Sequence, residues 1–314
     1  MAAALVFAAA TVPPRRLALD PLPDGTVAGA MHVHTNRSDG STVQSKWRRR
    51  RRGPGLRFVV FTDHGDATRA PDPPILSFGR PVPGRRQIST SGGHYIASRH
   101  AEVAVSTRGE PRDVVQDRRA GSADSGIAAH PDSPKLRLQW EDWTLPIDGV
   151  ELLNLDTSWR MLAGKTDWSS RRQLLIGLFD YPFRPAESMA RLIQPTAALP
   201  RWDAVNRTRR LVTVAGADAH AKLAPPSADP GDARLRCHCR PCESSFRVLH
   251  PFTCGRRYRF PAMPESAALI YAAIRSGHLY TAVDGLANAA GVQFSASNAA
   301  GAASEATRSP STAR

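Results

Sequence analysis

Residues 30–41 read AMHVHTNRSDGS, and this stretch decides how the rest of the chain is interpreted. It places His32 and His34 two positions apart and Asp39 five positions further on. The small and apolar run from Val27 to Val33 predicts a strand, in which residues two apart share a face. We therefore expect both imidazoles on one side of the strand's carboxyl end, with Asp39 in the polar loop that follows. This combination is typical of a divalent metal site; the simpler alternative is a strand end with two solvated histidines.

The same arrangement recurs at later strand ends. Length and apolar content predict buried strands at 56–62, 126–130 and 211–216, and a glycine turn predicts a hairpin at 87–97. The polar residues presented by these elements are His64, Gln87, His94, His130, Asp218 and His220. With the opening stretch, six of the chain's ten histidines lie at strand ends or in the hairpin. That concentration favours a metal site over a set of isolated structural histidines.

The strands alternate with segments of helical or irregular pattern. Further strands are predicted at 147–154 and 278–283. Helical apolar spacing is found at 111–119, 171–179, 185–194, 202–210 and 265–275. Such an alternation predicts an α/β fold of barrel type, with its site at the carboxyl ends of the strands.

The number of candidate ligands exceeds what one cation needs. Two or three divalent ions are expected, and the mixture of imidazole and carboxylate suits Zn, Mn or Fe. Adjacent cations suit the hydrolysis of phosphate esters, because they polarise the phosphoryl oxygen, generate hydroxide and stabilise the leaving oxygen. His64, His130 and Asp218 are the candidate catalytic residues, because imidazole and carboxylate groups transfer protons in such reactions.

Four segments together resemble the ordered motifs of the PHP (polymerase and histidinol phosphatase) family: HVHTNRSDG at 32–40, FTDH at 61–64, AHP at 129–131 and DAH at 218–220. The resemblance implies a distorted TIM-like (β/α)7 barrel with two or three metals. It implies one metal on His32, His34 and Asp218, and a second on Asp39, His64 and His220. It places the remaining ion on His94 and His130.

The resemblance also implies a reaction. The SDG form of the first motif is similar to that of small phosphoesterases acting on nucleotides or RNA ends. A metal-bound hydroxide would hydrolyse a phosphomonoester or a terminal phosphodiester of a nucleotide or nucleic-acid end. One departure bears on activity: Gln87 stands where that family has a metal-bridging Glu, and a neutral amide cannot bridge two cations as a carboxylate does. Glu151 is a candidate replacement. The alternative function is a catalytically impaired PHP-like protein that binds phosphate ligands or nucleic acid.

The 314 residues suffice for one large α/β domain or two ordinary ones. We expect a leader or linker at 1–26, a phosphoesterase domain at 27–290 with an irregular Arg/Cys/Pro-rich insert at 221–262, and a disordered tail at 291–314. Residues 2–12 resemble the apolar part of a signal peptide without its basic start. The protein would be cytoplasmic, or exported or membrane-proximal if that segment is a leader remnant. No apolar run has the length of a membrane span.

The formal net charge is +14, almost all of it from arginine. It suits a polyanionic partner or an anionic substrate, or is largely incidental surface charge. Five consecutive arginines at 48–52 indicate a nucleic-acid arm or, as we favour, a poorly ordered insert. A rival zinc site would use the cluster Cys237, His238, Cys239, Cys242, His250 and Cys254, although its spacing differs from standard zinc ribbons. The sequence predicts no oligomeric state.

Overall fold

The computed structural model describes residues 2–12, 20–22, 26–41, 56–64, 75–76, 85–98, 109–121, 126–220, 250–254, 264–288, 295–298 and 301–304. Two expectations from the sequence lie outside these ranges. The arginine run at 48–52 is one, and Cys237, Cys239 and Cys242 of the rival zinc site are the other. Of the insert expected at 221–262, only residues 250–254 are described.

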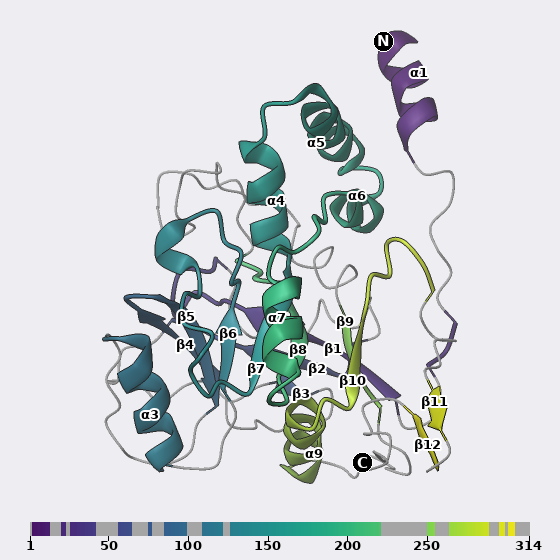
Figure 1. Cartoon of the computed structure of the whole chain (residues 1–314). Helices are drawn as coiled ribbons and strands as arrows, with labels where there is room; N and C mark the ends of the chain where they lie inside the picture. Colours follow the sequence, from purple (N-terminus) through teal and green to yellow (C-terminus); the bar gives the residue numbers. More distant parts are fainter. Residues whose placement is uncertain are drawn as a thin grey trace.

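Two five-stranded sheets form the centre of the molecule (Figure 1). The first has the order β10-β9-β1-β2-β3, with β1 (Thr26–Val33) in the middle. Its other strands are β2 (Phe58–Phe61), β3 (Ile75–Leu76), β9 (His250–Cys254) and β10 (Leu279–Ala282). The second has the order β4-β5-β6-β7-β8: β4 (Arg85–Thr90), β5 (Gly93–Ser98), β6 (Gly126–Ala129), β7 (Gly149–Asn154) and β8 (Val212–Gly216).

The direction of the strands brings several carboxyl ends together. β1 runs parallel to β2, and β6, β7 and β8 run parallel to one another. β5 is antiparallel to both of its neighbours, so its amino end lies where the carboxyl ends of β4 and β6 lie. Residues just beyond β1, β2, β6 and β8 are therefore available to one site, together with residues at the start of β5.

Backbone hydrogen bonds join the two sheets at two junctions. At the junction of β1 with the end of β8, the Ala217 amide donates to Met31 O at 2.9 Å and the Ala219 amide to His32 O at 3.1 Å. At the junction of β2 with β4, the Gln87 amide donates to Asp63 O at 3.4 Å. Both junctions are parallel bridges. Backbone hydrogen bonds thus join residues 32 and 219, which are far apart in the sequence.

One buried cluster of side chains draws on both sheets. It combines Met31 of β1 and Val60 of β2 with Ile96 of β5, Ile127 of β6 and Val214 of β8. Ile270 and Ile274 of α9 (Pro264–Arg275) pack against the same cluster. Seven of the eight residues of β1 are buried, as expected for a parallel strand that is covered on both faces. The core therefore fixes β1 from both sides.

Helices cover the outer face of the second sheet and one end of the molecule (Figure 1). α3 (Pro111–Gly121) packs Val114 and Val115 into a cluster with Tyr95 and Trp140. The other helices are the short η1 (Leu136–Leu138), α4 (Leu155–Gly164), α5 (Trp168–Asp180), α6 (Pro185–Arg191) and α7 (Leu199–Asn206). α4 starts directly at the end of β7, because the Asn154 side chain caps it by accepting from the Thr157 amide at 2.8 Å.

The amino-terminal segment forms α1 (Ala2–Thr11), which packs on α5. The Phe7 ring meets the Phe179 ring edge-on at 4.7 Å, and Thr11 Oγ1 donates to the buried carboxylate of Asp180 at 2.8 Å. Arg191 binds both the Thr11 carbonyl and Asp180. Within the described part of the chain, no helix has both the length and the apolar character needed to cross a bilayer.

The predicted α/β class is confirmed, with parallel and antiparallel pairing in both sheets. A helix that the sequence did not indicate is α4, whose buried residues include Thr157, Ser158 and Arg160 and so break the apolar pattern. Where we expected disorder, β11 (Ser295–Asn298) and β12 (Gly301–Ser304) pair with each other. The rest of that tail beyond residue 291 lies outside the described residues.

Candidate metal centre

Ligand-type side chains gather in two groups at the strand ends. The first, which we call the Asp39 group, consists of His34, Asp39, His64 and His220. The second, the Asp218 group, consists of His32, His130 and Asp218. In each group the ligand atoms lie within 4.8 Å of one another. A divalent cation among them would form bonds of about 2 Å to each ligand atom, so these separations are short enough for a shared ion.

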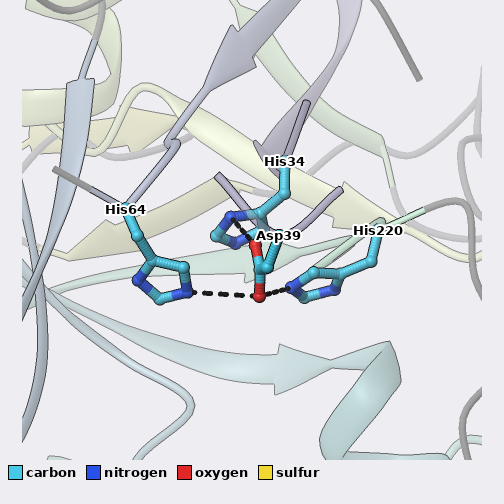
Figure 2. A group of neighbouring side chains, drawn as sticks. All are labelled: His34, Asp39, His64 and His220. Carbon is cyan, nitrogen blue, oxygen red and sulfur yellow. Dashed lines mark ion pairs between the residues drawn. The ribbon is translucent and has the colours of Figure 1, made fainter. Parts of the chain in front are cut away.

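Asp39 is at the centre of its group (Figure 2). Its Oδ1 lies 3.2 Å from His34 Nδ1, and its Oδ2 lies 3.1 Å from His220 Nε2 and 3.6 Å from His64 Nε2. The rings of His34 and His220 stack with their centroids 4.2 Å apart. The side chain of His64 is 32% exposed, so this imidazole forms the open side of an otherwise buried group.

The loop that carries Asp39 is held by a second carboxylate. Asp63 accepts from the Thr35 amide at 2.6 Å, from Thr35 Oγ1 at 2.9 Å and from Ser38 Oγ at 2.7 Å. Gly40 closes the loop against the His34 carbonyl, at a distance that leaves no room for a Cβ. Asp63 therefore positions Asp39 without taking part in its group.

The Asp218 group lies next to the Asp39 group, and Asp218 Oδ1 faces a histidine of each group. Asp218 Oδ1 lies 3.2 Å from His32 Nε2 and 3.4 Å from His34 Nε2. His34 Nε2 is buried and has no hydrogen-bond partner among the described residues. A buried polar atom of this kind is costly unless something binds it. Asp218 Oδ1 faces this nitrogen and Asp39 Oδ1 faces the other ring nitrogen, an arrangement of charge that suits a cation at either position.

Glu151 orients two of the histidines. Its Oε1 lies 2.7 Å from His32 Nδ1, and its Oε2 accepts from the His130 amide at 2.9 Å and from Asn154 Nδ2 at 3.0 Å. Glu151 therefore meets His32 at the ring nitrogen that faces away from Asp218. A carboxylate on the far nitrogen fixes the tautomer of a metal-ligating imidazole and raises its basicity. A Cβ at Gly216 would overlap this carboxylate, so the close approach of β7 and β8 requires glycine there.

The backbone is strained at the same residues. His32, His130 and Asp218 have φ values of 61°, 29° and 45°. They are the residues other than glycine with positive φ in the described part of the chain. Each such residue costs about 1–3 kcal/mol, and it persists where surrounding contacts hold it. At His32 the strain accompanies a register shift of β1 between Ala30 and Val33.

Gln87 fills the space beside the Asp218 group. Its Oε1 lies 2.9 Å from His32 Nε2, and its Nε2 lies 2.6 Å from His94 Nδ1 and 2.9 Å from His130 Nε2. His94 is held from its other side by Ser89 Oγ at 3.1 Å, and His130 Nδ1 by the Leu138 carbonyl at 3.2 Å. Every polar atom of the Gln87 amide thus has an imidazole partner.

These contacts set the charges of the site. Burial lowers the pKa of His34, but Asp39 and Asp218 outweigh it and raise that pKa to about 10. The pKa of His32 is raised in the same way by Asp218 and Glu151 against the effect of burial. Burial, reinforced by His130 and His64, lowers the pKa of His94 to about 2. Near pH 7 the site therefore holds a protonated His34 between carboxylates and a neutral His94 next to Gln87.

The remaining pKa shifts agree with this division. The pKa values of Asp39 and Asp218 fall below their usual range, because the neighbouring histidines outweigh the effect of burial. Burial lowers the pKa of His64 and of His130, so both imidazoles are neutral near pH 7.

All nine residues predicted from the sequence meet in one region, but their grouping differs from that implied by the resemblance. His34 joins Asp39, His64 and His220, and His130 joins His32 and Asp218. His94 belongs to neither group and contacts Gln87 instead. The roles of Asp63 and Asn154 were missed, although each lies at a strand end. Glu151 does not take the place of Gln87, because the two meet opposite nitrogens of His32.

Comparison with known proteins adds little to this geometry. No protein-family model matches the chain, and no curated protein matches it. Among solved structures, the chain is similar to a two-domain protein from Bacteroides vulgatus that contains a predicted PHP-like metal-dependent phosphoesterase. The identity is 12%, the TM-score is 0.44, and the match covers 86% of this chain and 69% of the other.

Proposed function

We propose that the protein is a metal-dependent phosphoesterase whose divalent cation is bound by the Asp39 group. The observation that carries this proposal is the convergence of three imidazoles and a carboxylate from three separate segments, within 4.8 Å of one another. The buried Nε2 of His34, which faces the Asp218 carboxylate at 3.4 Å without the geometry of a hydrogen bond, supports it further.

We further infer that the strands close into a distorted barrel of seven. The contacts β1-β2, β4-β5-β6-β7-β8 and the two bridges at Val33/Ala219 and His64/Gln87 form an unbroken circle. The cluster around Met31, which draws on five of these strands, would be the barrel interior. Such a barrel places its functional residues at the carboxyl ends of the strands.

A divalent cation bound here would polarise a phosphoryl oxygen and lower the pKa of a water ligand towards neutrality. The chain's own residues supply the rest. His64 is neutral near pH 7 and has the most exposed side chain of its group, so we assign it to the side of the cation where substrate enters. His130 and Asp218 are more enclosed, and we assign them to holding and orienting the centre.

The test is turnover of p-nitrophenyl phosphate and bis-p-nitrophenyl phosphate with added Mn²⁺. We expect activity that a chelator abolishes and Mn²⁺ restores, and that His220→Ala lowers at least 100-fold, because a deleted ligand costs more than the 10–100-fold typical of outer partners. His278→Ala, whose histidine lies between α9 and β10 away from the site, is the matched control. Equal activity in the His220 variant and the wild type would refute the proposal.

The substrate class is part of the proposal and is drawn from the sequence resemblance. We propose a phosphomonoester or terminal phosphodiester of a nucleotide or nucleic-acid end, consistent with the net charge of +14. Comparison of nucleoside 5′-phosphates, 3′,5′-bisphosphates and short RNA ends would test it.

Gln87 favours a second candidate, a protein that binds phosphate ligands without hydrolysing them. Its neutral amide forms hydrogen bonds with three imidazoles, and the nitrogens in these bonds would otherwise be free to bind cations. Phosphate binding without turnover in wild type, with turnover appearing in Gln87→Glu, would decide for this candidate.

A further inference from the structure

The contacts of the Gln87 amide differ from those of a side chain that merely lies near a metal. Its NH₂ group points at two imidazole nitrogens, His94 Nδ1 and His130 Nε2, and its oxygen points at a third, His32 Nε2. All three rings are buried, and so is Gln87 itself, with 2% of its surface exposed. Three imidazoles converging on one point usually surround a cation.

The hydrogen-bond pattern fixes which way the amide points. His130 Nδ1 faces the Leu138 carbonyl and must donate to it, which leaves Nε2 as an acceptor. His94 Nε2 can donate to Ser89 Oγ, which likewise leaves Nδ1 as an acceptor. The two amide hydrogens therefore point at two imidazole lone pairs. The flipped amide would set its oxygen against the lone pair of His130.

We propose that the Gln87 amide replaces a divalent cation between His94 and His130, so that the protein loads one metal through the Asp39 group while the Asp218 group is closed by hydrogen bonds. This inference rests on the proposed metal site and deepens it. The amide hydrogens satisfy the two lone pairs that a cation would accept, and the amide oxygen occupies His32 Nε2. The hydrogen bonds of the Gln87 amide go to His32, His94 and His130, and none goes to a residue of the Asp39 group.

A carboxylate at position 87 would reverse the situation. In Gln87→Glu, the oxygen that replaces the NH₂ group would face the acceptor nitrogens of both His94 and His130, and no hydrogen would lie between them. Buried acceptors facing one another are unfavourable, so the variant favours a cation there. The isosteric change is therefore expected to add a metal site rather than to remove one.

The experiment is a titration of the full chain with Mn²⁺, followed by electron paramagnetic resonance of free and bound ion. Mn²⁺ is chosen because the chain's four cysteines would compete for zinc, whereas Mn²⁺ prefers oxygen and imidazole ligands. We expect one tightly bound Mn²⁺ in wild type. In Gln87→Glu we expect two, with the spectral signature of a coupled pair.

His94→Ala provides the second measurement, and it holds even if Gln87→Glu fails to fold. In the wild-type background it should leave the Mn²⁺ affinity within about twofold, because His94 contacts Gln87 rather than a metal. In the Gln87→Glu background it should weaken the second site at least tenfold. Two tight ions in wild type, or an affinity lowered tenfold by His94→Ala alone, would overturn the inference.

The outcomes separate the two proposals. Two Mn²⁺ in wild type together with phosphoester turnover would refute the role of Gln87 and leave the proposed function standing. One Mn²⁺ in wild type, a second in Gln87→Glu and no turnover in either would support the role of Gln87 and refute the phosphoesterase. Absence of Mn²⁺ binding in every variant would refute both.

Discussion

Replacing Glu151 by glutamine tests how the centre is held together. Glu151 is fully buried and has three partners: His32 Nδ1 at 2.7 Å, the His130 amide at 2.9 Å and Asn154 Nδ2 at 3.0 Å. All three are donors. In Glu151→Gln one oxygen becomes an NH₂ group, which opposes a donor in either amide orientation as long as His32 keeps its proton on Nδ1.

The cost follows from these contacts. Removing one partner of a buried ion pair destabilises a protein by about 3–5 kcal/mol, and an opposed donor adds to this. We expect Glu151→Gln to lower the free energy of unfolding by about 4 kcal/mol in the metal-free protein. Glu141→Gln, an exposed carboxylate next to Trp140, is the control and should change it by less than about 0.5 kcal/mol.

The effect has a defined pH dependence. The pKa of Glu151 is lowered, because His32 outweighs burial, so the carboxylate stabilises the fold above about pH 4.3 and loses this contribution as pH falls through the lowered value. The pKa of His32 is raised, so its contribution is full below about pH 6.5 and is lost as pH rises through the raised value. Urea denaturation should therefore give the largest difference between wild type and variant near pH 5–6. A difference below about 1 kcal/mol, or one independent of pH, would refute this account.

Three further results are expected. Metal affinity should rise as pH increases towards 10, by up to about tenfold per unit, because a cation must displace the proton of His34; Mn²⁺ titration at several pH values checks this, and a flat profile would contradict it. Gly216→Ala should lower the melting temperature and release the fixed orientation of His32, since its methyl overlaps Glu151; thermal unfolding and histidine NMR would show both, and an unchanged melting temperature would argue against the close packing. Arg191→Ala should destabilise the docking of α1 by about 1–3 kcal/mol and speed its removal by limited proteolysis, because the Thr11 carbonyl and Asp180 lose a partner; equal cleavage rates would count against that contact.

The sequence indicated which ligand residues come together, but not how they are distributed between the Asp39 group and the Asp218 group. Strand alternation placed His32 and His34 on one face, and both do reach the same region. The left-handed turn at His32 and the register shift in β1 then assign them to different groups. Backbone strain of this kind depends on the contacts of the folded state, such as Glu151 on His32, and no local pattern encodes it.

The second limit concerns residues whose roles depend on distant partners. Asp63 was visible beside His64, yet its function is to hold the loop at Thr35 and Ser38. Gln87 was visible as a departure from a motif, and its three contacts arise only once the fold brings His32 of β1, His94 of β5 and His130 at the end of β6 to β4. Helix spacing, in contrast, is a local property, and it placed the helices around 171–179 and 265–275 well.

The junction between β1 and β8 has a consequence for how the protein matures. Asp39 and His220 are 181 positions apart, and the hydrogen bonds from Ala217 and Ala219 to β1 bring them together. During synthesis the first ligands emerge long before the last, so the Asp39 group cannot be complete until β8 has docked. Pairing across such a sequence separation forms slowly. Metal uptake is therefore expected as a late event, and the rate of incorporation during refolding would report on the closing of this junction.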